Sequence, residues 1–552
     1  MIEKILPYLT YNSEHPLLFT SLFFWVFLGL VLLVYSFLDK TTRTRNAYLF
    51  LVSLFFYYKT GGFYLVILLV STVADYVIGN RIYKTQTDWK KKSWLAASVI
   101  VNLSILIYFK YAYFFADFFT DITGIEVDVY NYFSWGFNNL VGTNFVWEKI
   151  LLPVGISFFT FQTMSYAIDI YRGQVKPVKS MLDFGFYVSF FPQLVAGPIV
   201  RAADFVPQLY QKYKLTRADF GIGLFWILNG LLKKLFLADY IAVNFVDRVF
   251  SNPGSYSGFE NMMALFGYTL QVYADFSGYT DIAIGVALWL GFRLPVNFNS
   301  PYKASSVGEF WRRWHISLSS WLKDYLYIPM GGNRSGSMFS NIMIGVIVLF
   351  VSLMAASWWV PVGFVGVAIT VFLAGKVLPA FKSWVSTNVN MMLTMLIGGL
   401  WHGASWNFVI WGGLNGLGLV FYKLWKKISP WGNKTKWYNR AIGIFTTLVF
   451  ITFTRAWFRG ESWDYTMLML QQIGTDFQPQ LVGEIIVGYK YVFIVMLGGF
   501  IIHWLPVGTK DWYRNTFVKA PHVVQALISL LAIIFIYQIL TADLQPFIYF
   551  AF

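Results

Sequence analysis

Long runs of apolar residues recur along the chain, and their hydrophobic positions are continuous rather than alternating. Leu17–Leu38 and Ser93–Phe109 are two such runs, and Leu393–Phe421 contains no Lys, Arg, Asp or Glu. About 20 apolar residues allow a helix to cross the hydrocarbon core of a bilayer, whereas transmembrane barrels need alternating strands. The pattern therefore predicts an all-α polytopic membrane protein with roughly eleven to thirteen membrane-embedded segments.

Two further runs differ from a simple crossing. Residues 335–375 are uncharged over a length that fits two crossings, so we expect an inserted transmembrane hairpin there. Phe184–Val200 is apolar but is interrupted by Pro192 and Pro198, which predicts a re-entrant or kinked element packed against protein or a cavity. Since no internal repeat or low-complexity linker divides the chain, residues 1–552 are interpreted as a single integral-membrane domain.

One predicted helix is too polar to face lipid. Leu151–Ile170 has Pro153 where the first helical turn is expected. Gln162, Thr163 and Asp169 follow within the same run. The polar side chains indicate that this helix packs inside the bundle.

Glu309–Tyr327 has the pattern of an amphipathic helix that lies along an interface. Ser306 and Glu309 form an S-x-x-E capping-box pattern at its start. Trp311, Trp314, Leu318, Trp321, Leu322 and Tyr325 then recur at helical spacing and form one apolar stripe. On this helix His315 lies at the border of the stripe, beside both protein and a polar cleft.

Composition supports the membrane assignment. Hydrophobic residues make up 57% and charged residues 12% of the chain, against about 45–50% and 25% in soluble proteins. The net charge of +15 is typical of basic cytoplasmic loops. These basic residues are spread over many loops without a nucleic-acid motif, so nucleic-acid binding is not expected. The absence of cysteine excludes disulfides and an acyl-cysteine intermediate.

His402 is the main candidate for chemistry. It is the one titratable group inside the uncharged run Leu393–Phe421, and an ionisable group inside a membrane segment indicates function. A neutral imidazole in a poorly solvated site accepts a proton from a hydroxyl, and a second imidazole, His315, would orient the acceptor or stabilise an oxyanion. The alternative is that both are structural. For His15, His503 and His522 we favour structural or interfacial positions.

Two carboxylates also lie in an apolar run. Asp275 and Asp281 have either a catalytic or metal-binding role or, as we favour, a structural role as partners of arginines or backbone groups. No metal site is expected, because H-x-x-x-H and H-E-x-x-H spacings are absent. G-x-S-x-G and phosphate-binding glycine motifs are absent too.

Several segments closely resemble the membrane-bound O-acyltransferase (MBOAT) family, most of all its bacterial alginate O-acetyltransferase branch. The segments that carry the resemblance are Phe310–Ser319, Trp321–Arg334, Gly398–Trp406, Leu152–Gln162, Phe191–Ile199 and Pro546–Phe550. His402 matches the invariant histidine of that family, and His315 matches its second conserved position. The resemblance covers most of the chain.

The resemblance implies a helical bundle around a funnel or tunnel, with His402 at its narrow part. It implies an acyl, most simply acetyl, transfer from a cytosolic thioester across the bacterial inner membrane to a hydroxyl of a cell-envelope polysaccharide. The donor would be acetyl-CoA, another acyl-CoA or an acyl-carrier thioester, with no tightly bound cofactor. An extracytoplasmic SGNH-like protein is the expected partner, alongside membrane lipids.

Five residues near the histidines are candidates for donor binding. They are Arg312, Arg313, Lys323, Trp401 and Asn407. The three basic residues would attract the phosphates of coenzyme A, and their alternative role is a solvated interfacial face.

Two other functions fit the same sequence. One is transfer of D-alanyl or longer acyl groups from a carrier protein. The other is a transporter or flippase, because broken helices and polar groups within apolar segments also occur in transporters.

Overall fold

Helices and their connections make up the computed structural model of the protein, with no strand among the residues it describes. The described residues are 9–12, 16–38, 41–195, 197–334, 336–429 and 436–539. The all-α prediction is therefore confirmed, whereas His15 and the closing motif Pro546–Phe550 lie outside the described residues.

The helices group into two compact units, which we describe separately. The first unit is formed by the chain up to Asn102, by Val154–Leu318 and by the chain from Arg440 onward. The second is formed by Leu103–Pro153 and Ser319–Asn439. The single-domain organisation expected for residues 1–552 stays a prediction.

The first unit contains most of the helices. They are α2 (Leu22–Leu38), α3 (Thr42–Gly61), α4 (Leu65–Lys84), α5 (Asp88–Leu106), α8 (Ile156–Tyr171), α9 (Met181–Ser189), α10 (Phe191–Leu194), α11 (Ala202–Leu209), α12 (Arg217–Leu231), α13 (Asp239–Ile241), α14 (Asp247–Ser251), α15 (Gly258–Trp289), α16 (Val307–Trp311), α22 (Trp437–Arg459), α23 (Trp463–Thr475), α24 (Val482–Gly488), α25 (Lys490–Trp504), α26 (Val507–Lys519) and α27 (His522–Ile539). The π-helical segments η3 (Leu232–Ala238) and η4 (Ala242–Val246) continue α12 and α13, and η6 (Pro301–Lys303) is a short 3-10 turn.

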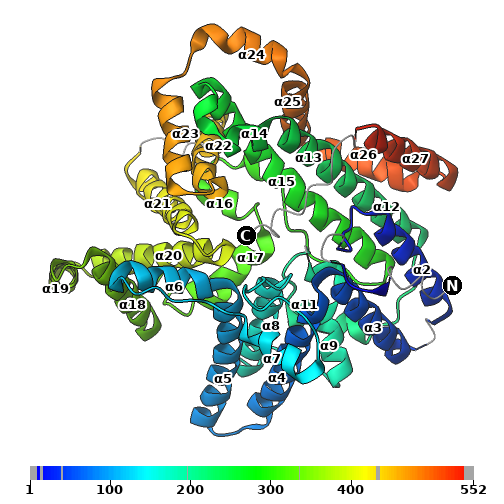
Figure 1. The fold of residues 1–552 in the computed structure, drawn as a ribbon, viewed down its shortest axis with the longest axis horizontal. Helices are drawn as coiled ribbons and strands as arrows, with labels where there is room; N and C mark the ends of the chain where they lie inside the picture. Colours follow the sequence, from blue (N-terminus) through cyan, green and yellow to red (C-terminus); the bar gives the residue numbers. More distant parts are fainter. Residues whose placement is uncertain are drawn as a thin grey trace. The chain divides into compact units, whose positions relative to one another are not determined.

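At the core of the first unit, α15 runs beside α12 (Figure 1). Ion pairs join η3, which continues α12, to α15: Lys234 Nζ lies 2.5 Å from Asp275 Oδ1, and Lys233 Nζ lies 2.7 Å from Asp281 Oδ2. The cations beside the two carboxylates are lysines rather than the expected arginines, and their structural role stays a prediction. A buried charge needs such a partner because removing it alone from water is costly.

The polar helix predicted at Leu151–Ile170 is buried, as expected, but begins at Ile156 rather than near Pro153. Gly155, with φ of 73°, precedes it, and a side chain there would clash with the carbonyl of Leu194. Thr163 donates to Asn102 Oδ1 at 2.9 Å, so the polar side chains of α8 find partners inside the unit. The predicted break in Phe184–Val200 is confirmed, because this buried run divides into α9 and α10.

The second unit is built from helical elements of two separate parts of the chain. They are η2 (Ile107–Tyr111), α6 (Ala112–Thr123), α7 (Tyr132–Val141), the second half of α17 (Ile316–Leu322), the π-helical η7 (Lys323–Tyr327), α18 (Met338–Ala355), α19 (Trp359–Val377), α20 (Pro379–His402) and α21 (Trp406–Ile428). The first residues of α17, up to Leu318, belong to the first unit. Two apolar helices, α18 and α19, occupy the region expected to be an inserted hairpin. Most of their side chains are exposed, as lipid-facing helices require.

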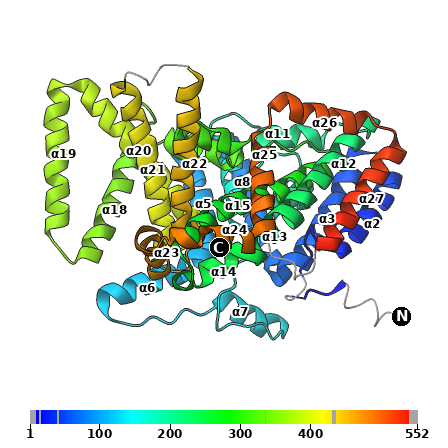
Figure 2. The ribbon, with the colours of Figure 1, turned by 90° about the horizontal axis from the view of Figure 1, so that it is seen from above.

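The uncharged run Leu393–Phe421 is not one crossing, which corrects the sequence prediction. Helix α20 ends at His402, and α21 begins at Trp406 and runs back alongside it (Figure 2). Glycines permit the close approach: a side chain on Gly399 would overlap the carbonyl of Phe408, and one on Gly412 would overlap that of Met395. Small residues at such interfaces let helix backbones pack closely in membranes.

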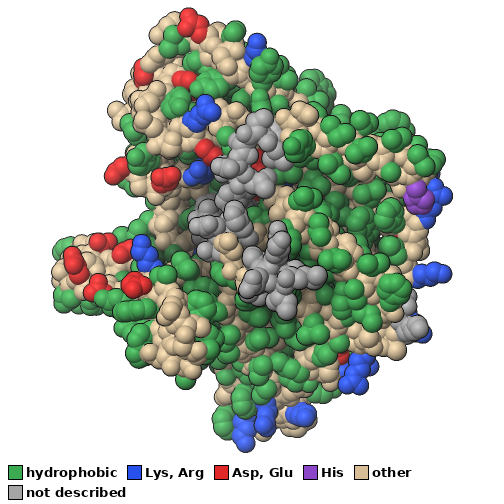
Figure 3. Space-filling model, turned by 45° about the vertical axis from the view of Figure 1, so that its right-hand side comes forward, with side chains coloured by type: hydrophobic (Ala, Val, Ile, Leu, Met, Phe, Trp, Pro, Cys, Tyr) green, Lys and Arg blue, Asp and Glu red, His purple; other side chains and the backbone are tan. Residues whose placement is uncertain are grey.

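Seven described helical stretches are long and apolar enough to cross a membrane, or up to nine if two bent helix pairs each count as one span. Large hydrophobic side chains are exposed on many helices, and they cover much of the face seen in Figure 3. The polytopic membrane character is confirmed. The number of described stretches is lower than the eleven to thirteen embedded segments expected from the sequence. That expectation also counted short or broken elements such as α9 and α10, which are not long enough to cross a membrane alone.

Gly412→Ala is expected to destabilise the protein by about 1–3 kcal/mol, because the new methyl group forces α20 and α21 apart. The measurement is the melting temperature of the detergent-solubilised protein. Gly413→Ala is the matched control, since a side chain there lies at an ordinary 3.5 Å from Leu396. Equal melting temperatures for the two variants would contradict the packing argument.

Candidate functional site

In the second unit, His402 is the last residue of α20 and is buried. Its imidazole lies between two indole rings in edge-to-face geometry, with centroid distances of 5.0 Å to Trp401 and 5.0 Å to Trp411. Such aromatic walls limit solvation of the imidazole. The imidazole of His402 is thus enclosed mainly by aromatic carbon.

The end of α20 is held by the π-helical turn η2. Tyr111 donates its hydroxyl to the carbonyl of Leu400 at 2.7 Å. The Lys110 ammonium donates to the carbonyls of Trp401 at 2.7 Å and His402 at 3.1 Å. The last carbonyls of a helix have no partners within the helix and carry its negative dipole end, so a cation is well placed there. Lys110 and Tyr111 thus fix the backbone that carries His402.

In the first unit, His315 lies in a turn rather than on a helix, which corrects the predicted helix Glu309–Tyr327. The segment divides into α16, α17 and η7, and His315 between α16 and α17 has a left-handed φ of 43°. The Ser306 cap is present, but Glu309 accepts from Ser305 instead of completing the box.

Asn297 organises this turn. Its backbone carbonyl accepts the N–H of Ile316 at 2.9 Å, and its side-chain Oδ1 accepts the N–H and the hydroxyl of Ser317. The same Oδ1 lies 3.3 Å from His315 Nδ1. These bonds replace the helical bonds that the amphipathic pattern predicts, so one distant asparagine breaks the helix and orients the imidazole.

The His315 ring is completely buried, with Phe276 edge-to-face at a centroid distance of 4.7 Å. Burial lowers the pKa of His315 from 6.5 to about 3. The imidazole is therefore neutral at pH 7, since desolvation disfavours its charged form.

The five candidate donor-binding residues have different surroundings. Arg313 is engaged, because its guanidinium pairs with Glu309 at 2.8 Å and donates to the carbonyl of Asn299. Arg312 and Lys323 are exposed, whereas Trp401 and Asn407 are buried in the second unit, Trp401 against His402. Their role in donor binding stays a prediction.

The structure also identifies residues that sequence reasoning missed. Asn297 lies in a loop without a recognisable motif, and its partners His315 and Ser317 follow 18 and 20 residues later, so that only the fold brings them together. Lys110 gave one weak signal, a single cation at the end of the apolar run Ser93–Phe109. No group of three His, Asp or Glu side chains in the described ranges is arranged to hold a metal ion.

Comparison with known proteins gives the family. The sequence model of the membrane-bound O-acyltransferase family, MBOAT, matches residues 5–354, which is more than half of the chain. The chain belongs to the membrane-bound O-acyltransferase family. The matched part of this MBOAT protein contains His315 and ends before His402.

Several relatives of this MBOAT chain have a named activity. The probable alginate O-acetylase AlgI of Pseudomonas aeruginosa is 38% identical over 403 residues, which cover 73% of this chain and 64% of that protein. The peptidoglycan O-acetyltransferase of Helicobacter pylori is 33% identical over 481 residues, 82% and 78% of the two chains. The teichoic acid D-alanyltransferase of Bacillus subtilis is 24% identical over 323 residues, 57% and 70%. The resemblance to the MBOAT family is thereby confirmed.

The burial of His315 predicts a pH dependence of stability. Because its folded-state pKa is lowered, the unfolded chain binds a proton below about pH 6.5 that the folded chain does not. This group therefore removes stability as the pH falls from 6.5 toward 4, by about 1.4 kcal/mol per pH unit, and contributes nothing above pH 6.5.

The measurement is detergent-induced unfolding of the wild type and of His315→Gln at several pH values. The variant should lack the pH-dependent loss of stability that His315 causes. The wild type should therefore lose more stability than the variant on acidification. Parallel pH profiles for the two proteins would show that His315 is not held neutral by burial.

Proposed function

We propose that this chain is an acyltransferase that moves an acyl group, acetyl in the simplest case, from a cytosolic thioester across the bacterial inner membrane. The acceptor would be a hydroxyl of a cell-envelope polysaccharide or of a partner protein that passes the group on. Family membership and relatives that are named as O-acetyltransferases of alginate and peptidoglycan support this proposal.

The observation that carries the proposal is the placement of His402. A general base must be weakly solvated and well positioned. The burial of His402 between two indole rings, and a helix end held by Lys110 and Tyr111, support this role.

In the proposed reaction His402 accepts the proton of the acceptor hydroxyl while its oxygen attacks the thioester carbonyl. A C–O bond forms and the C–S bond breaks. The thiolate that leaves takes a proton and departs as a thiol, so the imidazole returns to its neutral form. His315 would position the reacting groups: in the neutral ring Nδ1–H donates to Asn297 Oδ1, which leaves Nε2 as an acceptor.

The donor is proposed to be acetyl-CoA, another acyl-CoA or an acyl-carrier thioester. The exposed side chains of Arg312 and Lys323 can attract its phosphates, whereas Arg313 is already paired with Glu309. Trp401 and Asn407 would contact the donor near the reacting centre. An extracytoplasmic SGNH-like protein is the proposed partner.

A second candidate is transfer of a D-alanyl group. The Bacillus subtilis relative, named a teichoic acid D-alanyltransferase, favours it. Its identity of 24% is below the 38% and 33% of the O-acetyltransferase relatives, so we rank acetyl transfer first.

His402→Ala is expected to lower transfer from a labelled acyl thioester by at least about a hundredfold, because general-base catalysis contributes on the order of 10²–10⁴ in rate. The measurement uses purified protein in nanodiscs with acetyl-CoA and, separately, D-alanyl carrier protein as donors. Loss of the thioester is followed together with labelling of an acceptor glycan.

His522→Ala is the matched control, since His522 is an exposed residue at the start of α27. It should leave transfer unchanged. Undiminished transfer by His402→Ala would remove the proposed role of the imidazole, and absence of any transfer by the wild type would favour the transporter.

A further inference from the structure

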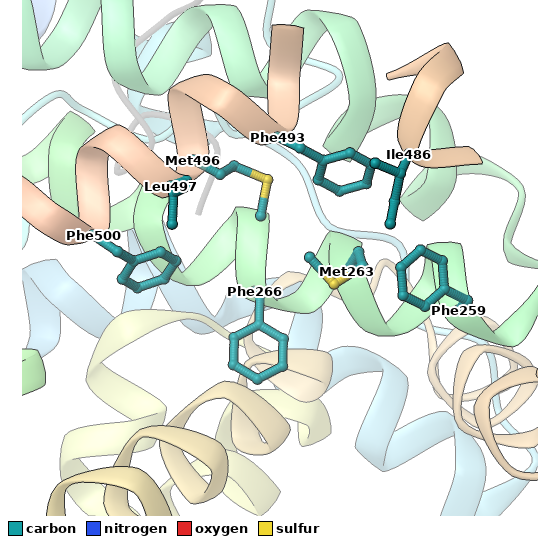
Figure 4. A pocket seen from close by; sticks show the side chains of 8 residues that line it. All are labelled: Phe259, Met263, Phe266, Ile486, Phe493, Met496, Leu497 and Phe500. Atoms are coloured by element: carbon teal, nitrogen blue, oxygen red, sulfur yellow. The ribbon is translucent and has the colours of Figure 1, made fainter. Parts of the chain in front are cut away.

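An apolar groove lies in the first unit, and neither candidate histidine is among its lining residues. Its volume is about 460 Å³, and helices α15, α24 and α25 form its walls. Phe259, Met263 and Phe266 of α15 face Phe493, Leu497 and Phe500 of α25 (Figure 4). Within each set the residues are three or four positions apart, so each helix contributes one stripe of side chains to the groove.

The lining fits an aliphatic chain. All eight lining residues are hydrophobic, so the groove has no polar group that would orient a water-soluble ligand. Helix α25 belongs to a bent pair that is apolar enough to span the membrane. Leu497 and its neighbours Ile494 and Ile501 are exposed, which opens the groove to the surroundings of this helix.

Ring contacts join the lining residue Phe500 to two segments, each of which contains a lysine. The Phe500 ring lies 6.4 Å from the Tyr302 ring and 5.8 Å from that of Trp504, centroid to centroid. Lys303 follows Tyr302 and donates to the carbonyl of Leu505 at 2.6 Å. Lys510 donates to the hydroxyl of Ser300 at 2.9 Å and to a carbonyl at the end of α25 at 2.8 Å.

These lysines carry charge that the described part of the chain does not balance. No carboxylate among the described residues lies within 4.0 Å of either ammonium. Burial and then the nearby cations Arg313 and Arg440 lower the pKa of Lys303. Since Arg313 is paired with Glu309, the excess positive charge falls on Lys303, Lys510 and Arg440.

We propose that the groove and these cations form a binding site for an anionic membrane phospholipid. One acyl chain lies along α25 between the two apolar stripes, and the phosphate accepts hydrogen bonds from Lys303 and Lys510. Basic pockets between membrane helices bind lipid headgroups in this way. Trp504 at the junction has the amphipathic ring typical of the membrane–water interface.

The alternative is that the lysines only cap the last carbonyls of α25. Such a cap uses one or two of the three donors on each ammonium and requires no lipid. The two roles differ in one measurable property, the preference for an anionic over a zwitterionic headgroup.

The test is native mass spectrometry of the full chain after incubation with phosphatidylglycerol or phosphatidylcholine. The wild type should retain phosphatidylglycerol preferentially. Lys303→Gln combined with Lys510→Gln should lower this preference on the order of tenfold, because each basic residue near the surface contributes to anionic lipid binding. Lys519→Gln, an exposed lysine at the far end of α26, is the matched control and should change nothing.

A second variant tests the groove itself. Leu497→Trp fills the cavity and should reduce retention of both lipids severalfold, whereas Ile494→Trp, an exposed side chain outside the lining, should not. Equal retention by wild type and Leu497→Trp would overturn the acyl-chain site.

The soluble donor is the competing source of phosphate. Coenzyme A that binds lipid-free protein through Lys303 and Lys510, with no effect of Leu497→Trp, would overturn the lipid proposal. Acyl transfer need not change in any of these variants, so the outcome is independent of the proposed enzyme activity.

Discussion

A helix that ends away from water must find hydrogen-bond donors for its last carbonyls, and this requirement governs the candidate site. Helix α20 ends at His402, where water is scarce, and the ammonium of Lys110 and the hydroxyl of Tyr111 supply the donors. The positive charge of Lys110 is attracted to the negative end of the helix dipole, and this attraction offsets part of the free-energy cost of burying the charge. The place of the imidazole therefore depends on a turn far away in the sequence.

The same principle operates at the second histidine. Asn297 provides both a backbone and a side-chain acceptor to the first residues of α17, and His315 takes up the left-handed conformation that this connection demands. Both candidate histidines lie where a helix ends or begins, and neither lies in the middle of one. The backbone at both positions is held by tertiary hydrogen bonds in addition to those of the helix itself.

Sequence reasoning succeeded where a local pattern decides the structure. The uncharged apolar run 335–375 located α18 and α19, and the polar side chains of α8 correctly indicated a buried helix. It failed at Leu393–Phe421 and at Glu309–Tyr327, both of which were predicted as continuous. Helical periodicity continues across both breaks, while the partners that end the helices, Lys110, Tyr111 and Asn297, come from other segments. The spatial relation of the two histidines and the residues that bind the donor are likewise beyond what local patterns reveal.

The ion pairs between η3 and α15 also bear on how the protein is made. Lys234 pairs with Asp239 five residues later, so part of its charge is balanced within its own segment. The carboxylate beside Lys233, Asp281, belongs to the later helix α15. Since a charge in an apolar segment is costly without its partner, we expect the segment of Lys233 to insert more favourably together with α15 than alone.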